Sequence, residues 1–276
     1  MPRRRGANDA VIARQSAHGL GGGLALHRRS VGPHGHLHAK IYVFSHSGTA
    51  WVGSFNPSGN EPENAAVIAE IGDQDRGHNL LVGLDEPALV AALAAHVERL
   101  CAATSTLRDR FRSDHNRPVA GHESRLFFYP RLAARIVEPA VEALQPGDRI
   151  DGAVSHLKPG ALGDALVAAA RRGVAIRLVV HDTERRVPQA LVDALAGAGV
   201  DVIRYRHPDE LPMHAKFLLL TGDGGTECWF GSHNFNPRSR WLNHELLVAT
   251  HDPAIVGPIA SGFADVRTAA LRSESG

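Results

Sequence analysis

The sequence predicts an α/β protein built from two pseudo-symmetric halves, each with a mixed β-sheet flanked by helices. Three observations lead to this prediction: a motif that occurs twice, a regular alternation of strand-like and helix-like segments before its second copy, and a shorter stretch before its first. With 276 residues, 43% of them hydrophobic, the chain is long enough for about two domains. We place the halves at residues 1–122 and 123–276.

The two copies of the motif have the same order of residue types. Residues 37–56 read LHAKIYVFSHSGTAWVGSFN, and residues 213–234 read MHAKFLLLTGDGGTECWFGSHN. Each copy has His-Ala-Lys, an apolar run, a polar turn and a second apolar run that ends in Gly-Ser-x-Asn. The similarity continues in residues 78–100 and 244–266, which both predict a strand, an acidic turn with proline and a helix. One duplication indicates paired half-domains, since solenoids need more repeats.

The second half predicts a complete series of elements in which strands and helices alternate. Glycine or proline closes each helix, and runs of apolar residues form the strands. We expect strands at 125–129, 149–154, 174–181 and 200–206, and helices at 132–144, 161–172 and 188–198. This alternation favours parallel strands. The three strands that follow His214 are joined by short turns, so we expect them to pair antiparallel and to make the sheet mixed.

The first half has a shorter lead-in to its motif. Eighty-nine positions separate Arg125 from His214, whereas only 37 residues precede His38. The other elements expected here are a short helix, a strand, an inserted hairpin and a linker, at residues 9–15, 23–27, 64–84 and 104–123. Three explanations of the short lead-in stay open: a fragment or misassigned start, a second chain, such as a homodimer partner, that covers the gap, or a reduced paralogue.

Composition argues against several classes of protein. Lysine and arginine number 30 against 29 acidic residues, a net charge of +1, which disfavours a dedicated nucleic-acid binder but allows a local basic groove. No apolar run reaches membrane-spanning length and no signal peptide is recognisable, so a cytoplasmic or peripheral membrane location is the default, with the compartment left open. His34 and His36 precede His38, but this spacing defines no metal geometry, and we expect neither a metal nor a cofactor.

The motif residues suit the binding of a phosphate. Because side chains two apart in a strand share a face, each histidine of a His-Ala-Lys segment points with its lysine, and the Gly-Ser-x-Asn turn adds an amide. These residues are His38, Lys40 and Asn56 in the first half, and His214, Lys216 and Asn234 in the second. One histidine would attack phosphorus while the other moves protons, and the lysines would neutralise charge without a metal.

This duplicated pattern resembles the phospholipase D superfamily, whose members share it together with a two-fold α/β/α fold and an active site between the halves. Residues 231–248, GSHNFNPRSRWLNHELLV, resemble the bacterial cardiolipin synthase-like branch. The resemblance implies a metal-independent phosphodiesterase or phosphatidyltransferase that acts on phospholipids or related phosphodiesters through a phosphohistidine. Following the family tendency, it implies His38 as nucleophile and His214 as general acid, although the sequence itself does not distinguish them.

The same resemblance implies residues around the histidines. Glu245 would orient His214 through its other ring nitrogen. The hydroxyls expected to border the substrate are those of Ser54, Ser232 and Ser239. The carboxylate of the first half is open between Glu63, which we prefer, and Glu70, while Asn79 aligns with Glu245 in the downstream repeat but is no carboxylate.

Two other functions stay open at this point. A nuclease of the same superfamily would show a basic groove and cleavage that falls steeply with salt. A non-catalytic remnant would bind a phosphate or a partner without turnover. Among the remaining polar residues, His156 and His181 lie at predicted strand ends, where α/β sheets bind ligands, and Arg186 is expected to be an exposed loop charge.

Overall fold

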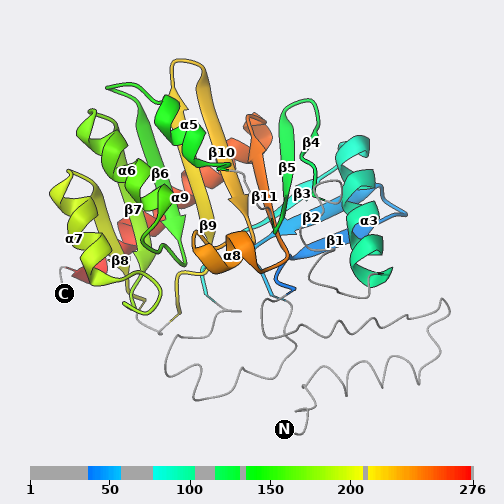
Figure 1. The fold of residues 1–276 in the computed structure, drawn as a ribbon, viewed down its shortest axis with the longest axis horizontal. Coiled ribbons are helices and arrows are strands. Elements are labelled where there is room, and N and C mark those ends of the chain that lie inside the picture. The colour runs from blue at the N-terminus through cyan, green and yellow to red at the C-terminus, as the bar shows by residue number, and fades with distance from the viewer. Residues whose placement is uncertain (1–36, 57–76, 103–115, 131–134, 208–210, 275–276) are drawn as a thin grey trace, which may run out of the picture.

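The computed structural model describes residues 37–56, 77–102, 116–130, 135–207 and 211–274 (Figure 1). Within these ranges the chain forms a mixed α/β structure with one large sheet, one small sheet and flanking helices. This confirms the predicted mixed α/β class with flanking helices, and the division into two halves stays a prediction. The helix and strand expected before the first motif lie outside the described residues.

The large sheet has eight strands. In spatial order they are β4 (Val119–Ala120), β5 (Ser124–Tyr129), β11 (Glu245–Thr250), β10 (Gly225–Gly231), β9 (Lys216–Gly222), β6 (Arg149–Val154), β7 (Ala175–His181) and β8 (Asp201–Tyr205). Strands β6, β7 and β8 are parallel, and all other neighbours are antiparallel. The sheet is therefore mixed, and β9, β10 and β11 pair antiparallel across their short turns, as predicted.

Both faces of the large sheet are covered, which explains its continuous apolar strands. Helices α5 (Glu138–Ala143), α6 (Ala161–Arg171) and α7 (Gln189–Gly197) lie on one face, and α9 (Pro253–Glu274) lies on the other (Figure 1). Successive side chains of β9 alternate between the two cores: Leu218 and Leu220 pack under α5–α7, whereas Phe217 and Leu219 pack toward α9. The described residues include no helix long and apolar enough to cross a bilayer.

The small sheet contains the first copy of the motif. Its strands, all antiparallel, are β1 (Ile41–Phe44), β2 (Thr49–Gly53) and β3 (Leu81–Leu84), and α3 (Pro87–Ala102) packs against them. The second strand of the expected hairpin at 64–84 is β3, which pairs with β2 as β11 pairs with β10. Residues 64–72 lie outside the described ranges, so the hairpin itself stays a prediction. Leu84 of β3 shares one core with Leu89 and Leu93 of α3, and this favours the observed register.

The helix expected at 132–144 is shorter in the structure. Helix α5 begins at Glu138, where proline stands in the first turn, and residues 131–134 lie outside the described ranges. The other predicted bounds in the second half agree to within one or two residues. The division of the chain at 122/123 stays a prediction.

Candidate active site

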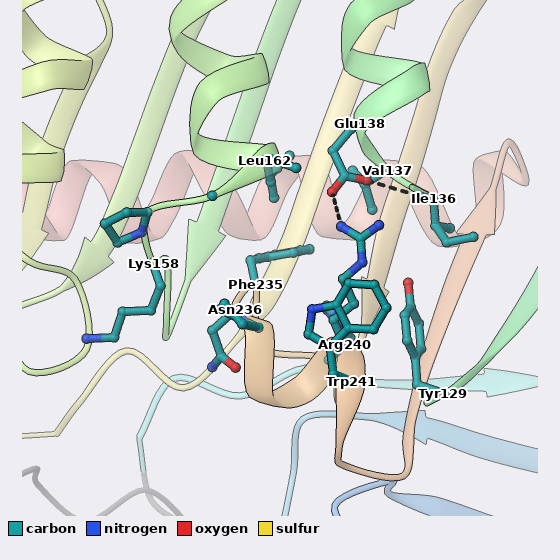
Figure 2. Close-up of a pocket in the computed structure, with 15 residues that line it drawn as sticks. Tyr129, Ile136, Val137, Glu138, Lys158, Leu162, Phe235, Asn236, Arg240 and Trp241 are labelled. Carbon is teal, nitrogen blue, oxygen red and sulfur yellow. Dashed lines mark hydrogen bonds and ion pairs between the residues drawn. The ribbon is translucent and has the colours of Figure 1, made fainter. Parts of the chain in front are cut away.

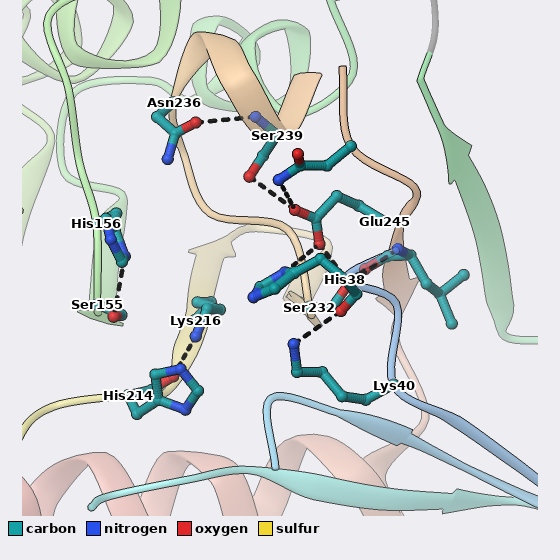
Figure 3. A network of polar contacts seen from close by, with 12 residues as sticks. His38, Lys40, Ser155, His156, His214, Lys216, Ser232, Asn236, Ser239 and Glu245 are labelled. Atoms are coloured by element: carbon teal, nitrogen blue, oxygen red, sulfur yellow. Dashed lines mark hydrogen bonds and ion pairs between the residues drawn. The ribbon is translucent and has the colours of Figure 1, made fainter. Parts of the chain in front are cut away.

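Each His-Ala-Lys segment is held by backbone bonds from the other half of the chain. The amides of His38 and Ala39 donate to the carbonyl of His244, at 3.0 and 2.8 Å. Reciprocally, the amide of His214 donates to the carbonyl of His78 at 3.0 Å. These crossed contacts bring the two motifs, which lie 176 positions apart in sequence (214 − 38), to one place beside the end of β9 (Figure 3).

The two lysines of the motifs occupy equivalent positions. Lys40 Nζ donates to the carbonyl of His38 at 2.8 Å, and Lys216 Nζ donates to the carbonyl of His214 at 2.5 Å. Lys216 is fully buried. This burial, together with the charges of Lys40 and Arg186, lowers the pKa of Lys216 well below its ordinary value, and the charge of Glu245 only partly opposes the shift. A buried ammonium is costly without an anion, so this position is suited to a bound phosphate.

Glu245 contacts His38, not His214, which corrects the pairing expected from the sequence. Its Oε2 lies 2.7 Å from Nδ1 of His38 and accepts from the Ser232 hydroxyl at 2.7 Å. Its Oε1 accepts from the Ser239 hydroxyl at 2.8 Å and from the Asn243 amide at 3.0 Å. The reason is that the start of β11 lies beside the first motif, where the carbonyl of His244 accepts from the amides of His38 and Ala39.

This network keeps Glu245 ionised. Burial alone would raise the pKa of the carboxyl, but the charge and hydrogen bond of His38 outweigh it, helped by His233 and by the Asn243 amide, and bring the pKa to about 2. Burial lowers the pKa of His38, and the charges of Lys40 and Lys216 act in the same direction, whereas Glu245 opposes them. The pKa of His38 therefore lies below its ordinary value, and the fixed anion of Glu245 limits this lowering.

We call each motif histidine, with its lysine and the group that contacts its Nδ1, a half-site. In the half-site of His214, Asn79 takes the place that Glu245 has beside His38. Its Oδ1 lies 2.7 Å from Nδ1 of His214 and accepts from the Ser54 hydroxyl at 3.1 Å, just as Glu245 joins His38 to Ser232. The downstream repeat indicated this residue, and only its lack of charge argued against it. The preferred candidate Glu63 and the alternative Glu70 lie outside the described residues.

The environment of His214 differs electrostatically from that of His38. Burial lowers the pKa of His214 well below its ordinary value, and the charges of Lys216, Lys40, Arg186 and His38 lower it further. In the part of the chain that the structure describes, the charges that shift this pKa are all positive. The ring is therefore kept neutral.

The glycine of each Gly-Ser-x-Asn turn allows a close approach of two strands. A Cβ on Gly231 would stand 2.2 Å from the carbonyl oxygen of Leu246, and one on Gly53 would stand 2.0 Å from that of Leu80. Both contacts are far too short for carbon and oxygen, so each strand would have to move. The serine that follows each glycine then reaches the partner of a histidine.

We therefore expect Gly231→Ala to destabilise the protein by about 1–3 kcal/mol, because the added methyl group meets backbone that cannot move aside cheaply. Urea denaturation at constant pH would measure the loss. Gly224→Ala is the matched control, since nothing lies within 4 Å of a Cβ at that turn position. Equal stability of the two variants would contradict the expectation.

The structure places the three predicted serines behind the histidines. The hydroxyl of Ser54 holds Asn79, and those of Ser232 and Ser239 hold Glu245. Ser239 belongs to α8 (Pro237–Trp241), which the sequence analysis did not predict and which Asn236 caps by accepting from the Ser239 amide at 2.9 Å. These serines orient the groups that contact the histidines.

The two asparagines of the motifs differ in burial. Asn234 is 7% exposed, and its buried Oδ1 has no hydrogen-bond partner within the described ranges. Its side chain therefore has hydrogen-bonding capacity left for a ligand. Asn56, at the end of the first motif, is half-buried.

Arg186 is a site residue that the sequence analysis misjudged. We expected a solvated loop charge, but the residue is only 4% exposed. Its Nη1 donates to the Ser155 hydroxyl at 3.0 Å and lies 3.4 Å from Nδ1 of His156. Ser155 and His156 directly follow β6, on the same side as Lys216 (Figure 3). The position of His156 at a strand end was a signal for this cluster, whereas nothing in the sequence marks Arg186 as buried.

A cavity of about 290 Å³ lies beside the segment that leads from Asn234 into α8 (Figure 2). Phe235, Leu162 and Trp241 give it largely apolar walls, and an ion pair joins Arg240 to Glu138 at 3.0 Å on its rim. Among the described residues, no group of three or more His, Cys, Asp or Glu side chains is arranged to hold a metal ion. His34 and His36 lie outside them.

Comparison with known proteins identifies a family to which part of the chain is similar. The family described as "Cardiolipin synthase, PLD-like domain" matches residues 142–267. This segment therefore resembles the phospholipase D superfamily. The matched residues of the phospholipase D-like domain include His214, Lys216 and Glu245. No curated protein matches the sequence.

A solved structure shares the fold. Phosphatidylserine synthase of Haemophilus influenzae Rd KW20 matches with a TM-score of 0.60 at 12% identity, over 85% of this chain and 62% of that one, so this chain spans less than two thirds of that protein. At this identity the likeness concerns the fold alone. Nuc from Salmonella typhimurium, a phospholipase D family member, matches at 21% identity over 52% of this chain and 93% of that one, with a TM-score of 0.45.

Proposed function

We propose that this protein is a metal-independent phosphodiesterase or phosphatidyltransferase that acts on phospholipids or related phosphodiesters through a phosphohistidine. The observation that carries the proposal is the pair of half-sites. Each contributes a histidine with a polar partner at 2.7 Å on Nδ1, and a buried lysine on the histidine carbonyl. This leaves Nε2 of both rings for a phosphate.

The two histidines and two lysines would divide the work of phosphoryl transfer. One Nε2 attacks phosphorus, and the other gives a proton to the leaving oxygen and later takes one from water or an alcohol. Lys40 and Lys216 stabilise the charge that develops on the phosphoryl oxygens. Water as the acceptor gives hydrolysis, and an alcohol gives transfer.

Three observations favour a lipid substrate over a nucleic acid. The family that matches residues 142–267 is named for cardiolipin synthase. The cavity beside Asn234 has largely apolar walls, which suit the apolar part of an amphipathic ligand. The overall charge of +1 also gives no strong attraction for a polyanion.

The decisive experiment is hydrolysis of bis-p-nitrophenyl phosphate in chelator, with the wild type compared with His38→Ala and His214→Ala. We expect the wild type to turn over, and each substitution to lower the rate by at least about 10³-fold, because the histidines act as a unit. Inactive wild-type protein of native circular dichroism would contradict the proposal.

A second comparison separates the two substrate classes. The wild type would be assayed on vesicles of anionic phospholipid and on single-stranded DNA at two salt concentrations. Cleavage or headgroup exchange on the lipid alone supports the proposal. Proteins that contact several phosphates lose about 10³–10⁵ in affinity between roughly 50 and 200 mM salt. If DNA were cleaved faster than lipid and this cleavage fell steeply over that salt range, the protein would be assigned as a nuclease instead.

A further inference from the structure

We propose that the outer edge of β3 is a docking site for an extended peptide segment, which adds a strand to the small sheet in the slot between β3 and α9. This β3–α9 slot is a cavity of about 640 Å³ and is larger than the one beside Asn234. Residues of β3 form one wall, and Ile255, Ile259 and Gly262 of α9 form the other. The proposal concerns a partner and goes beyond the reaction at the two half-sites.

The backbone of β3 directs one row of hydrogen-bonding groups into the slot. The amide of Ser54 donates to the carbonyl of Leu80 at 2.8 Å, and bonded and unbonded pairs alternate along the strands from there. In this register the N–H and C=O groups of Leu81 and Gly83 point away from β2. Within the described residues, β3 is the last strand on this side of the small sheet. Such an edge is a template for a further strand.

The second half of the chain shows what occupies the corresponding position. The sequence repeat makes β11 the counterpart of β3, and α9 the counterpart of α3. In the second half β5 pairs antiparallel with β11, opposite Leu247 and Ala249, which are the counterparts of Leu81 and Gly83. A strand therefore covers this edge in one half, whereas the described part of the other half leaves the same edge facing a cavity.

The helix beside each edge supports the same comparison. Phe128 of β5 stacks on His96 of α3, with ring centroids 4.1 Å apart. In the repeat, His96 corresponds to Gly262 of α9, which lines the slot. Nothing lies within 4 Å of a Cβ built on Gly262. The slot therefore has room for a large side chain at the place where Phe128 lies in the other half.

These features define the chemistry of the occupant. An extended peptide supplies the N–H and C=O groups that the edge of β3 needs, and an aliphatic chain does not. The apolar walls require aliphatic or aromatic side chains at alternate positions. Asp85 and Asp252 line the slot where β3 ends and α9 begins, which suits a basic residue of the partner. The sequence of β5, SRLFFY, meets these conditions.

The slot also reaches the half-site of His214. His78 and Asn79 line it. The carbonyl of His78 accepts from the amide of His214, and Oδ1 of Asn79 lies 2.7 Å from its Nδ1. A strand docked in the slot would therefore hold the segment that positions His214.

The test uses a fluorescently labelled peptide with the sequence of residues 122–130, HESRLFFYP, titrated into the full chain. We expect saturable binding that slows hydrogen exchange at the amides of Leu81 and Gly83. Phe127 lies opposite Leu247 at a position bonded through the backbone. A peptide with Phe127→Pro has no N–H there and should bind about ten-fold more weakly or worse.

Two substitutions in α9 locate the binding site. Gly262→Phe would fill the slot and should weaken binding of the peptide by about ten-fold or more. Gly257→Phe is the matched control, because this residue lies on the same helix but does not line the slot, and nothing stands within 4 Å of a Cβ at either position. Phenylalanine favours a helix more than glycine does, so both variants should keep the native circular dichroism.

Each other result would overturn the proposal. Failure of the unmodified peptide to bind, equal binding of the proline peptide, or equal binding to Gly262→Phe would each do so. Binding of decanoate that Gly262→Phe abolishes, without binding of the peptide, would assign the slot to an aliphatic chain. A wild-type dimer that Gly262→Phe dissociates would assign it to a second copy of this chain. Because every readout is binding or assembly, these results do not depend on phosphodiester cleavage.

Discussion

Glu245→Ala is expected to destabilise the folded protein by about 3–5 kcal/mol and to lower kcat/KM by about 10²–10⁴-fold. The carboxylate accepts four hydrogen bonds, and its removal leaves the hydroxyls of Ser232 and Ser239 buried without their acceptor. It also removes the anion that holds His38. Both losses come from a single side chain because it is fully buried at the centre of the network (Figure 3).

The contribution of Glu245 to stability depends on pH in a definite direction. Its pKa is lowered from 4.5 to about 2 on folding, so the folded state binds this proton less readily than the unfolded chain. The stabilisation is therefore fully present above pH 4.5 and is lost as the pH falls toward about 2. The difference in stability between wild type and Glu245→Ala should shrink over the same interval.

Urea denaturation at a series of pH values would measure both effects, with Glu245→Gln as the control that keeps the shape and removes the charge. Glu245→Gln should retain more stability than the alanine variant while still losing activity. If Glu245→Ala were as stable as the wild type at neutral pH, the network would not hold the fold as we infer.

Lys216→Met is expected to change stability and activity in opposite directions. A linear apolar side chain fits the fully buried position of Lys216 without the cost of burying an ammonium, so we expect a gain of about 1–2 kcal/mol. The hydrogen bond to the carbonyl of His214 is lost and reduces this gain. Because the charge that would stabilise the transition state disappears, kcat/KM should fall by about 10²–10³-fold.

The stability gain should itself depend on pH. Burial lowers the pKa of Lys216 well below 10.5, so below that pH the unfolded chain binds a proton that the folded state holds weakly. Wild-type stability therefore rises as the pH approaches 10.5, and the advantage of methionine is largest at lower pH and fades toward 10.5. Thermal denaturation between pH 6 and 10 would check this trend.

Inorganic phosphate provides the control for the Lys216 prediction. If the lysine is kept for anion binding, phosphate should raise the melting temperature of the wild type and have a smaller effect on Lys216→Met. A variant that is less stable than the wild type, or one stabilised equally by phosphate, would contradict this explanation of the buried charge.

Much of the site was predictable because its residues repeat in the sequence. The two histidine–lysine pairs follow from the period of a strand, and the Gly-Ser turns mark where the neighbouring strand ends. Asn79 was indicated by the downstream repeat, but its lack of charge made Glu63 the preferred choice. The structure shows that an amide also holds an imidazole at Nδ1, because only an acceptor is needed there. The role of Glu63 stays a prediction.

The burial of Arg186 could not be predicted in this way. It lies in a loop with no repeat partner, and only the packing of that loop against Ser155 after β6 removes it from water. The pairing of Leu81–Leu84 with β2 could not be predicted either, because an apolar strand can pair along either of its two edges.

By itself the sequence determined the mixed α/β class, the strand order within each motif and the residues that form the two half-sites, because these depend on local periodicity and on a duplication. Only the tertiary structure decided which half supports which histidine. The reciprocal backbone bonds at His38 and His214 cross the halves, so Glu245 serves His38 and Asn79 serves His214. The spacing of residues along a chain carries no information about such crossing, and it is this crossing that makes the two histidines chemically unequal.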